Sequence, residues 1–217
     1  MRTVLLTGFE PFDGEQINPS WETVRRLDGA RIQGGLVHAR QLPCRFGESL
    51  RVLHLAIREL DPDLIICVGQ AGGRAAVTPE RVAINVDDAR ITDNAGRKLI
   101  DRAIVLGGPV GYWSTLPIKA IVARVTSQGI PAAVSQTAGT FVCNHVFYGL
   151  MHALAATRRR PRPRGGFIHI PYLPGQVRGK KATPSLPLTK MVAALRTAVG
   201  VSLRQRRDRI VSGGATH

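Results

Sequence analysis

The stretch Asp-Pro-Asp-Leu-Ile-Ile-Cys-Val-Gly, residues 61–69, decides the fold class. Its middle part, Asp63–Val68, is a nearly continuous apolar run that is bounded by Pro62 and Gly69. A run of this length without polar alternation is typical of a strand buried on both faces of a parallel sheet. Cys67 lies inside the run, which indicates a core residue. The stretch therefore predicts a central parallel strand.

Strand-like and helical segments alternate on both sides of this central strand. Further strands are predicted at Val4–Leu6, Gly35–Leu42, Ala132–Ser135 and Gly166–Ile170, and helices at 18–27, Gly47–Leu60, Leu116–Val125, Phe141–Ala156 and Leu186–Leu203. The alternation predicts an α/β fold, a three-layer α/β/α sandwich around a mostly parallel, twisted sheet. The stretch Gly69–Gly108 lacks helical periodicity and is rich in Gly, Asn and Asp, which predicts long ordered loops that serve a site.

Length and composition are consistent with one ordinary domain. The 217 residues, 44% of them hydrophobic, predict a single domain over 1–217 with a flexible tail at about 205–217. The three cysteines form no Cys-x-x-Cys pair, which makes a disulfide framework or a zinc site a poor interpretation. The first apolar run is too short for a signal peptide or a membrane span, so we expect a cytoplasmic protein that does not enter a membrane.

The formal charge of +15 raises the question of nucleic-acid binding. The densest basic runs lie at 158–164, predicted as a surface connection, and at 204–209, predicted as part of the tail. Neither run contains aromatic residues that could stack on bases. The sequence therefore favours a protein without a specific nucleic-acid function. A basic nucleic-acid-binding module on an α/β scaffold is the alternative from a different class of protein.

Cys143 has the best sequence context for a nucleophile. The segment Ser135–His145 leaves a predicted strand, turns at Gly139 and enters a helix, with Thr140 as the predicted N-cap. Cys143 then lies in the first turn, where the helix N-terminus favours a thiolate and backbone N–H groups can meet an oxyanion. A small apolar residue at a helix start is an equal alternative on this pattern alone.

Two further side chains are candidates to assist Cys143. His169 ends an apolar strand just before Pro171, where α/β sheets present functional groups, although a structural histidine is the commoner reading. His145 is a poor base, because positions i and i+2 of a helix point to different faces. A zinc site made of Cys143, His145 and His169 lacks a persuasive spacing. On pattern alone, Glu80 is a solvated carboxylate or the partner of a neighbouring arginine.

Several long segments, taken in order, carry more information than any single motif. They are residues 7–14, 17–22, 69–74, 78–85, 88–91, 114–120, 135–145 and 167–174. Together they resemble the pyroglutamyl peptidase I family of cysteine peptidases, and the resemblance spans most of the chain. It implies hydrolysis of the bond after an N-terminal pyroglutamyl residue. It also implies a catalytic triad in the chain order Glu80, Cys143 and His169.

The resemblance implies a substrate pocket as well. Its members are Phe9, Phe12, Ile91, Phe141 and Val142 around the lactam ring, Gln70 as its polar contact, and Arg90 near the developing oxyanion. Pyroglutamate has no free α-amine, and a flat lactam is well held by aromatic faces and a few hydrogen bonds. Two residues depart from the family's pattern, namely Thr92 in a loop and Cys44 near the pocket.

The resemblance further implies that the enzyme needs no metal or organic cofactor. Its partners would be peptides with an N-terminal pyroglutamate and other copies of the chain, in a dimer or a tetramer. A second alternative is an enzyme with other chemistry on a similar sheet, such as a nucleoside phosphorylase that binds phosphate through Gly-rich loops. The pair Gly72-Gly73 is too short a signal to favour that interpretation.

Overall fold

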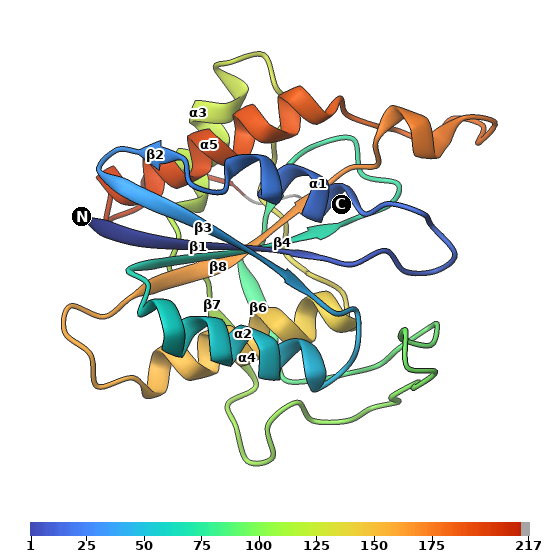
Figure 1. The fold of residues 1–217 in the computed structure, drawn as a ribbon, viewed down its shortest axis with the longest axis horizontal. Helices are drawn as coiled ribbons and strands as arrows, with labels where there is room; N and C mark the ends of the chain where they lie inside the picture. The colour runs from blue at the N-terminus through green and yellow to red at the C-terminus, as the bar shows by residue number, and fades with distance from the viewer. Residues whose placement is uncertain (214–217) are drawn as a thin grey trace.

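A computed structural model describes residues 1–213 of the chain (Figure 1). Within this range the main sheet contains, in spatial order, β2 (Arg31–Ile32), β3 (Gly35–Leu42), β1 (Arg2–Phe9), β4 (Leu64–Gln70), β8 (Arg164–Ile170) and β5 (Thr78–Pro79). The strands from β3 to β8 are parallel, and the short edge strands β2 and β5 are antiparallel to their neighbours. The prediction of an α/β fold with a mostly parallel sheet is confirmed.

Strand β4, which contains the apolar run, is central as predicted. It pairs with β1 on one side, with Val4 opposite Leu64, and with β8 on the other side, with Leu64 opposite Arg164. All its residues from Leu64 to Gly69 are buried, and only Gln70 at its carboxyl end is partly exposed. An uninterrupted apolar run is what a strand with covered faces requires, because neither set of alternating side chains reaches water.

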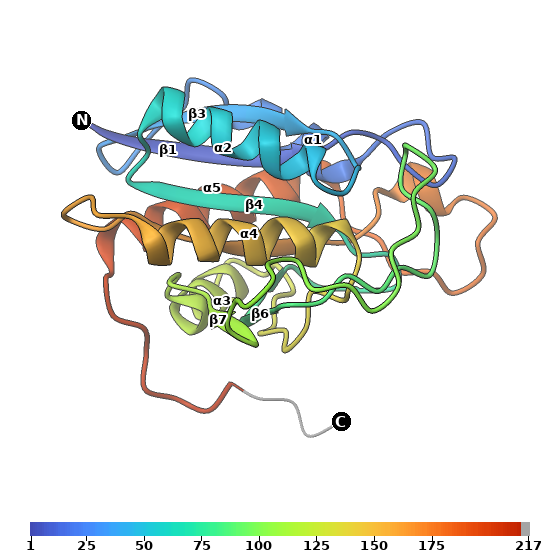
Figure 2. The same ribbon diagram turned by 90° about the horizontal axis from the view of Figure 1, so that it is seen from below.

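Helices cover both faces of the sheet (Figures 1 and 2). One face packs against α1 (Pro19–Val24), α3 (Ile118–Thr126) and α5 (Leu188–Arg204), and the other against α2 (Glu48–Leu60) and α4 (Val142–Ala156). Each face of the sheet has its own hydrophobic core, because successive side chains of a strand point to opposite faces. In β1, Leu6 belongs to the core under α1, α3 and α5, and Leu5 to the core under α2 and α4. Short 3₁₀ helices follow α1 at Arg25–Leu27 and β8 at Pro174–Val177.

The N-termini of α1 and α4 differ in how well the sequence predicts their capping residues. Helix α1 begins as expected, because the side chain of Asn18 accepts a hydrogen bond from the N–H of Ser20 and Pro19 occupies the first helical position. The predicted N-cap of α4, Thr140, is wrong. Phe141 is the N-cap residue, and the hydroxyl of Thr140 donates instead to the carbonyl of Asp88, at 2.7 Å. The start of α4 is thereby joined to the loop that follows β6.

The segment predicted as a strand at Ala132–Ser135 forms only isolated bridges. It lies parallel to the β5 region, with Ala132 opposite Val77 and Ser135 opposite Glu80. Strand β5 is only two residues long, and its Pro79 has no N–H to donate, so a regular ladder cannot extend along this edge. The bridges nevertheless fix Glu80 at the edge of the sheet.

The long stretch after β4 is irregular but ordered. It contains only β5 and β6 (Val82–Ile84) as strands, and β6 pairs with β7 (Gly111–Trp113) in a separate small sheet. Residues 85–110 form extended loops at the carboxyl end of the main sheet (Figure 2). This agrees with the expectation of long ordered loops in the stretch Gly69–Gly108.

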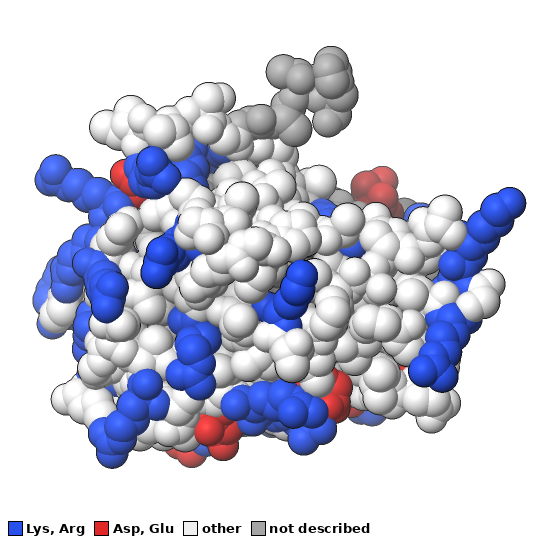
Figure 3. Space-filling view, turned by 90° about the horizontal axis from the view of Figure 1, so that it is seen from above, with Lys and Arg blue, Asp and Glu red and all other residues white. Residues whose placement is uncertain are grey.

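The end of the described chain contacts α3. Asp208 accepts hydrogen bonds from the N–H groups of Lys119 and Ala120, and the carbonyl of Gly213 accepts one from Arg81. The predicted tail falls partly outside the described residues, at 214–217, and its flexibility and the single-domain boundary stay predictions. Among residues 1–213, no helix has the length and apolar character needed to cross a bilayer. The surface over α3 and α5 is rich in Lys and Arg (Figure 3).

Candidate active site

Cys143 lies where three elements meet. It is the second residue of α4, it is partly exposed, and its Sγ faces the carboxyl end of β4. A Cβ atom on Gly69 would stand 2.8 Å from this sulfur, so the absence of a side chain at Gly69 makes room for the thiol. In the register of β4 and β8, Gly69 is the direct neighbour of His169. The thiol and the imidazole therefore occupy adjacent positions at the carboxyl end of the parallel strands β4 and β8.

His169 and Glu80 form a buried pair. The Nδ1 atom of His169 lies 2.7 Å from Oε1 of Glu80, and the Glu80 side chain is fully buried. The pair is positioned by β5, since Thr78 is opposite His169 and the N–H of Glu80 donates to the carbonyl of Phe167. A carboxylate at Nδ1 holds the proton on that atom, which leaves Nε2 as the acceptor of the neutral ring.

Arg74 also binds Glu80, which the sequence pattern did not single out. Its Nη1 donates to Oε1 of Glu80 at 2.7 Å and to Oγ1 of Thr78 at 2.8 Å, while Nη2 donates to the carbonyl of Thr137. Glu80 is thus both the partner of a histidine and the partner of an arginine. The guanidinium offsets part of the cost of burying this carboxylate. Only the position of Arg74 in the segment 69–74 could have pointed to it.

The surroundings of Cys143 affect the protonation of its thiol. Burial raises the pKa of the Cys143 thiol well above its ordinary value, Cys44 and Glu80 raise it further, and Arg74 lowers it. A helix N-terminus favours a thiolate, whereas desolvation of the thiol favours its protonated form. The resting thiol is protonated, so attack on a carbonyl requires a base at hand. The arrangement suits a nucleophile whose proton is taken during the attack.

His145 is engaged elsewhere. Its Nδ1 lies 2.8 Å from Oδ2 of Asp87, and its Nε2 accepts a hydrogen bond from the N–H of Gly47 at 2.9 Å. Both ring nitrogens are therefore used inside the protein, which agrees with its rejection as a base. The ring also contacts Phe46 edge-on, and Phe46 in turn contacts Phe141 edge-on, each at 5.4 Å between ring centres. His145 thus supports the aromatic residue that precedes the nucleophile.

A cavity of about 630 Å³ adjoins this group of residues. Five of the seven predicted substrate-binding residues line it: Phe12, Gln70, Arg90, Ile91 and Phe141. Glu80, Cys143 and His169 do not line the cavity themselves. Two wall residues are close to the thiol in sequence, since Gln70 follows Gly69 and Phe141 precedes Cys143 by two residues.

The other two predicted residues, Phe9 and Val142, are absent from the wall of this cavity. Both are buried in the core on the α2 and α4 side of the sheet, and the Phe9 ring lies 6.4 Å from that of Phe167. They can support the pocket from behind.

Sequence reasoning missed several other residues that line the cavity. These include Asp13, Glu15, Tyr172 and Lys180. The Nζ atom of Lys180 lies 2.9 Å from Oε1 of Glu15, and this hydrogen bond lowers the pKa of the Glu15 carboxyl. Tyr172 belongs to the segment 167–174, which carries the resemblance, whereas nothing in the sequence marked Lys180.

Gln176 orients one of the predicted binding residues. Its Nε2 donates to Oε1 of Gln70 at 3.0 Å and contacts Oε2 of Glu15 at 3.2 Å. Because the Gln70 oxygen already accepts this bond, the NH₂ group of Gln70 is the part left to donate to a ligand.

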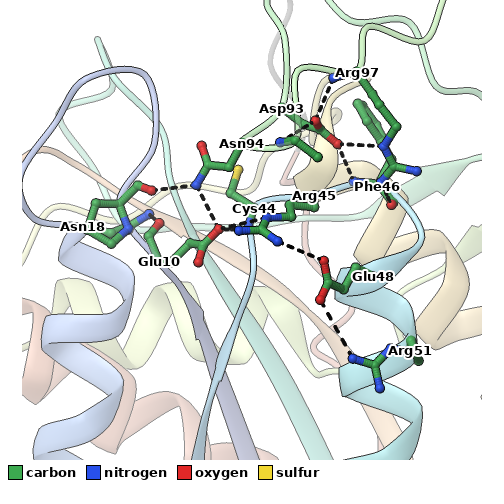
Figure 4. Close-up of polar contacts among 12 residues, drawn as sticks. Glu10, Asn18, Cys44, Arg45, Phe46, Glu48, Arg51, Asp93, Asn94 and Arg97 are labelled. Carbon is green, nitrogen blue, oxygen red and sulfur yellow. Dashed lines mark hydrogen bonds and ion pairs between the residues drawn. The ribbon is translucent and has the colours of Figure 1, made fainter.

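A polar network fixes the loop that carries Arg90 and Ile91 (Figure 4). Oε1 of Glu10 accepts from the N–H of Cys44 and from the side-chain amide of Asn94, at 3.0 and 2.8 Å. In the same network, Asp93 accepts from the N–H of Phe46 at 2.9 Å, and Arg97 donates to the carbonyl of Phe46.

The two residues that depart from the family's pattern both lie near this network. Cys44 takes part through its backbone, and burial raises the pKa of its thiol to about 12, so this side chain serves packing. Thr92, beside Asp93, is exposed.

The chain is similar to known proteins over its whole length. A family model described as pyroglutamyl peptidase matches residues 2–205. Pyrrolidone-carboxylate peptidase 1 of Ralstonia nicotianae is 60% identical and the pyrrolidone-carboxylate peptidase of Klebsiella pneumoniae 59% identical, each over 217 residues and 100% of both chains.

Solved structures give the same result. A crystal structure of pyroglutamyl peptidase I from Bacillus amyloliquefaciens matches with a TM-score of 0.92 at 52% identity, covering 96% of this chain and 100% of that one. A mutant pyrrolidone carboxyl peptidase from Pyrococcus furiosus matches with a TM-score of 0.89 at 43% identity, covering 93% and 98%.

Proposed function

The chain belongs to the pyroglutamyl peptidase family, and on this basis we propose that it hydrolyses the bond after an N-terminal pyroglutamyl residue and releases pyroglutamate from peptides. The observation that carries the proposal is the His169–Glu80 pair beside Cys143, next to a cavity with aromatic walls. Membership of the family supports the reaction. The geometry supports the assignment of roles to these three residues.

In the proposed reaction, Sγ of Cys143 attacks the carbonyl carbon of the pyroglutamyl residue. Nε2 of His169 takes the thiol proton, and Glu80 holds the ring and stabilises the imidazolium that forms. The raised pKa of the Cys143 thiol supports this order of events, because a protonated thiol must lose its proton as the sulfur–carbon bond forms. His169 then protonates the leaving amine, and water hydrolyses the thioester.

Two groups can stabilise the oxyanion of the tetrahedral intermediate. The first N–H groups of α4 have no partner within the helix, and they lie beside Cys143. Arg90, an exposed residue on the cavity wall, can add a positive charge from the opposite loop.

Selectivity for a lactam follows from the chemistry of the cavity. The rings of Phe12 and Phe141, with centres 6.2 Å apart, form an apolar corner for the flat ring. The NH₂ group of Gln70 is available to donate to the lactam carbonyl. The carboxylate of Glu15 is already paired with Lys180, so it is poorly placed to bind the ammonium of an ordinary N-terminus. These features together favour pyroglutamate over an unblocked residue.

The direct test is cleavage of pyroglutamyl-aminomethylcoumarin, with prolyl-aminomethylcoumarin as the comparison. We expect cleavage of the first and little of the second, because proline has a charged amine in place of the lactam. Cys143→Ala should abolish turnover, whereas Cys44→Ala, which removes a buried thiol nearby, should keep it. Full activity of Cys143→Ala would overturn the assignment of the nucleophile.

We also propose that the protein forms a homo-oligomer and works in the cytoplasm. Large apolar side chains are exposed on β7 and on the loop that leads into it, with Leu106 91%, Val110 87% and Trp113 69% exposed. Such a patch is typical of a surface covered by a partner, here a second copy. Cys44, Cys67 and Cys143 are all free thiols, as expected in a reducing compartment. Light scattering on the wild type and on Leu106→Glu/Trp113→Glu tests the first point: a monomeric wild type would contradict it.

A further inference from the structure

A second cavity, of about 750 Å³, lies between α3, α5 and β2. This is the other end of the sheet from Cys143, since Ile32 on its wall pairs with Gly35 at the start of β3. Five arginines line it, namely Arg31, Arg124, Arg196, Arg204 and Arg209, and no acidic side chain of residues 1–213 does. We call it the arginine groove. The face of the molecule that carries α3 and α5 shows many Lys and Arg side chains (Figure 3).

The groove gathers five arginines that have no acidic partner among residues 1–213 around one cavity, whereas others without such a partner, such as Arg58 and Arg158, lie outside it. Elsewhere many have acidic partners, as in the pairs made by Arg25, Arg40, Arg45, Arg51, Arg74, Arg97 and Arg159. Others bind the carbonyls at the end of α5, as Arg2 and Arg164 do. In the groove, Arg204 donates to Oε1 of Gln33 and Arg31 contacts the sulfur of Met1. No ion pair to a described residue involves any of the five.

Helix dipoles account for only part of this cluster. Arg124 and Arg204 lie in the last turns of α3 and α5, where a positive charge is favourable. Arg196 lies in the middle of α5, Arg31 on β2 and Arg209 beyond the end of α5, so no such benefit applies to them. Like charges gathered around one cavity repel each other, and a bound anion removes that repulsion.

We infer that the arginine groove binds a compact anion that carries several phosphate groups. Guanidinium groups match phosphate oxygens in paired hydrogen bonds, and the volume is that of a small-molecule site. A neutral donor also lies on the wall, because the side-chain oxygen of Gln128 accepts a hydrogen bond from the hydroxyl of Thr197 and its NH₂ group is left to donate. No aromatic side chain of residues 1–213 lines the groove, so it offers nothing on which a base could stack. The chemistry therefore favours an oligophosphate over a nucleic acid.

Inorganic triphosphate is a suitable probe, measured by isothermal titration calorimetry at 150 mM NaCl with the full chain. We expect saturable binding at one site per chain. In Arg124→Gln/Arg196→Gln the Kd should rise by about tenfold or more, which corresponds to the loss of about 1.4 kcal/mol. The matched control is Arg158→Gln/Arg160→Gln, which removes the same charge from exposed residues outside the groove.

Three results would overturn the inference. They are the absence of saturable triphosphate binding to the wild type, an equal Kd in the groove variant, and an equal loss of affinity in both variants. Binding of duplex DNA with a steep salt dependence, in the absence of triphosphate binding, would also overturn it and would assign a nucleic-acid surface instead. Both variants should cleave pyroglutamyl-aminomethylcoumarin like the wild type, which shows that they fold.

Discussion

At the scale of single residues, the space around the candidate nucleophile depends on a missing side chain. Gly69 leaves room for the thiol of Cys143, and a Cβ atom there would also stand 2.9 Å from the ring of Phe167. Gly69→Ala should therefore displace the thiol and lower kcat by about tenfold or more, since small misplacements at a reacting atom are costly. Gly175→Ala is the control, because a Cβ at Gly175 meets nothing within 4 Å. Equal activity of the two variants would contradict this account of Gly69.

Glu80 is the second residue whose contribution can be measured. Glu80→Gln keeps the shape of the side chain but removes the negative charge that faces His169 and Arg74. We expect kcat to fall by about 10²- to 10⁴-fold, less than in Cys143→Ala, because an orienting group is less indispensable than the attacking atom. Steady-state kinetics with pyroglutamyl-aminomethylcoumarin give the answer, with circular dichroism as the check on folding. An unchanged kcat would exclude an orienting role.

The local sequence predicts some of these residues and not others. Cys143 and His169 were candidates from their own contexts, a helix start and a strand end. Glu80 came only from the resemblance, because its contact with His169 is created by the pairing of β5 with β8 and leaves no local pattern. Arg74 was missed for the same reason. The raising of the Cys143 pKa by burial could not be read from the sequence, because burial is a property of the packed protein.

At the scale of elements, the loop after β6 is held over the cavity by a few carboxylates. Burial alone would raise the pKa of the Asp93 carboxyl. It is nevertheless held below its ordinary value of 3.8, because the carboxylate accepts hydrogen bonds from the N–H groups of Arg97, Phe46 and Ala95 and lies near the charge of Arg97. A lowered pKa means that the stabilisation is complete above pH 3.8 and is lost as the pH falls through the lower value in the folded state.

Asp93→Asn tests this anchor. At pH 7 the variant should lose about 1–3 kcal/mol of unfolding free energy, because a buried acceptor of backbone hydrogen bonds is weakened. The difference from the wild type should shrink as the pH falls below 3.8, which urea titrations at pH 7 and at pH 3 can measure. KM should rise, since the loop carries Arg90 and Ile91. A difference that grows in acid would show that another group is responsible.

Elements with strong periodicity were predictable, and the elements at the edges of the sheet were not. The central strand and the helices around it follow from apolar runs and helical spacing. The segment Ala132–Ser135 looked like a strand, but Pro79 and the short length of β5 limit it to bridges. Of the two alternative functions, the nucleoside phosphorylase loses its basis with the family match over residues 2–205.

At the scale of the whole molecule, charge is the dominant feature. The net charge of +15 makes the folded state repel itself, and added salt screens this repulsion. Raising NaCl from 20 to 300 mM should increase the Tm by a few degrees, roughly 2–5 °C on the scale expected for about 1 kcal/mol. Arg158→Gln/Arg160→Gln has two positive charges fewer, so its Tm should increase less with salt. A Tm that falls with salt would indicate that ion pairs outweigh the repulsion.

The pairing of β4 with β8 has a consequence for how the protein is made. Strand β8 is the second neighbour of the central strand β4, and it also carries His169. On the ribosome, the candidate base therefore emerges after Cys143, by roughly one to five seconds at ~5–20 residues per second. During that interval the nascent chain has its thiol, but it lacks the candidate base and the main sheet is still without β8. With the roles proposed above for Cys143 and His169, we expect no peptidase activity before synthesis has passed Ile170, so the unfinished chain and its surroundings meet no active nucleophile.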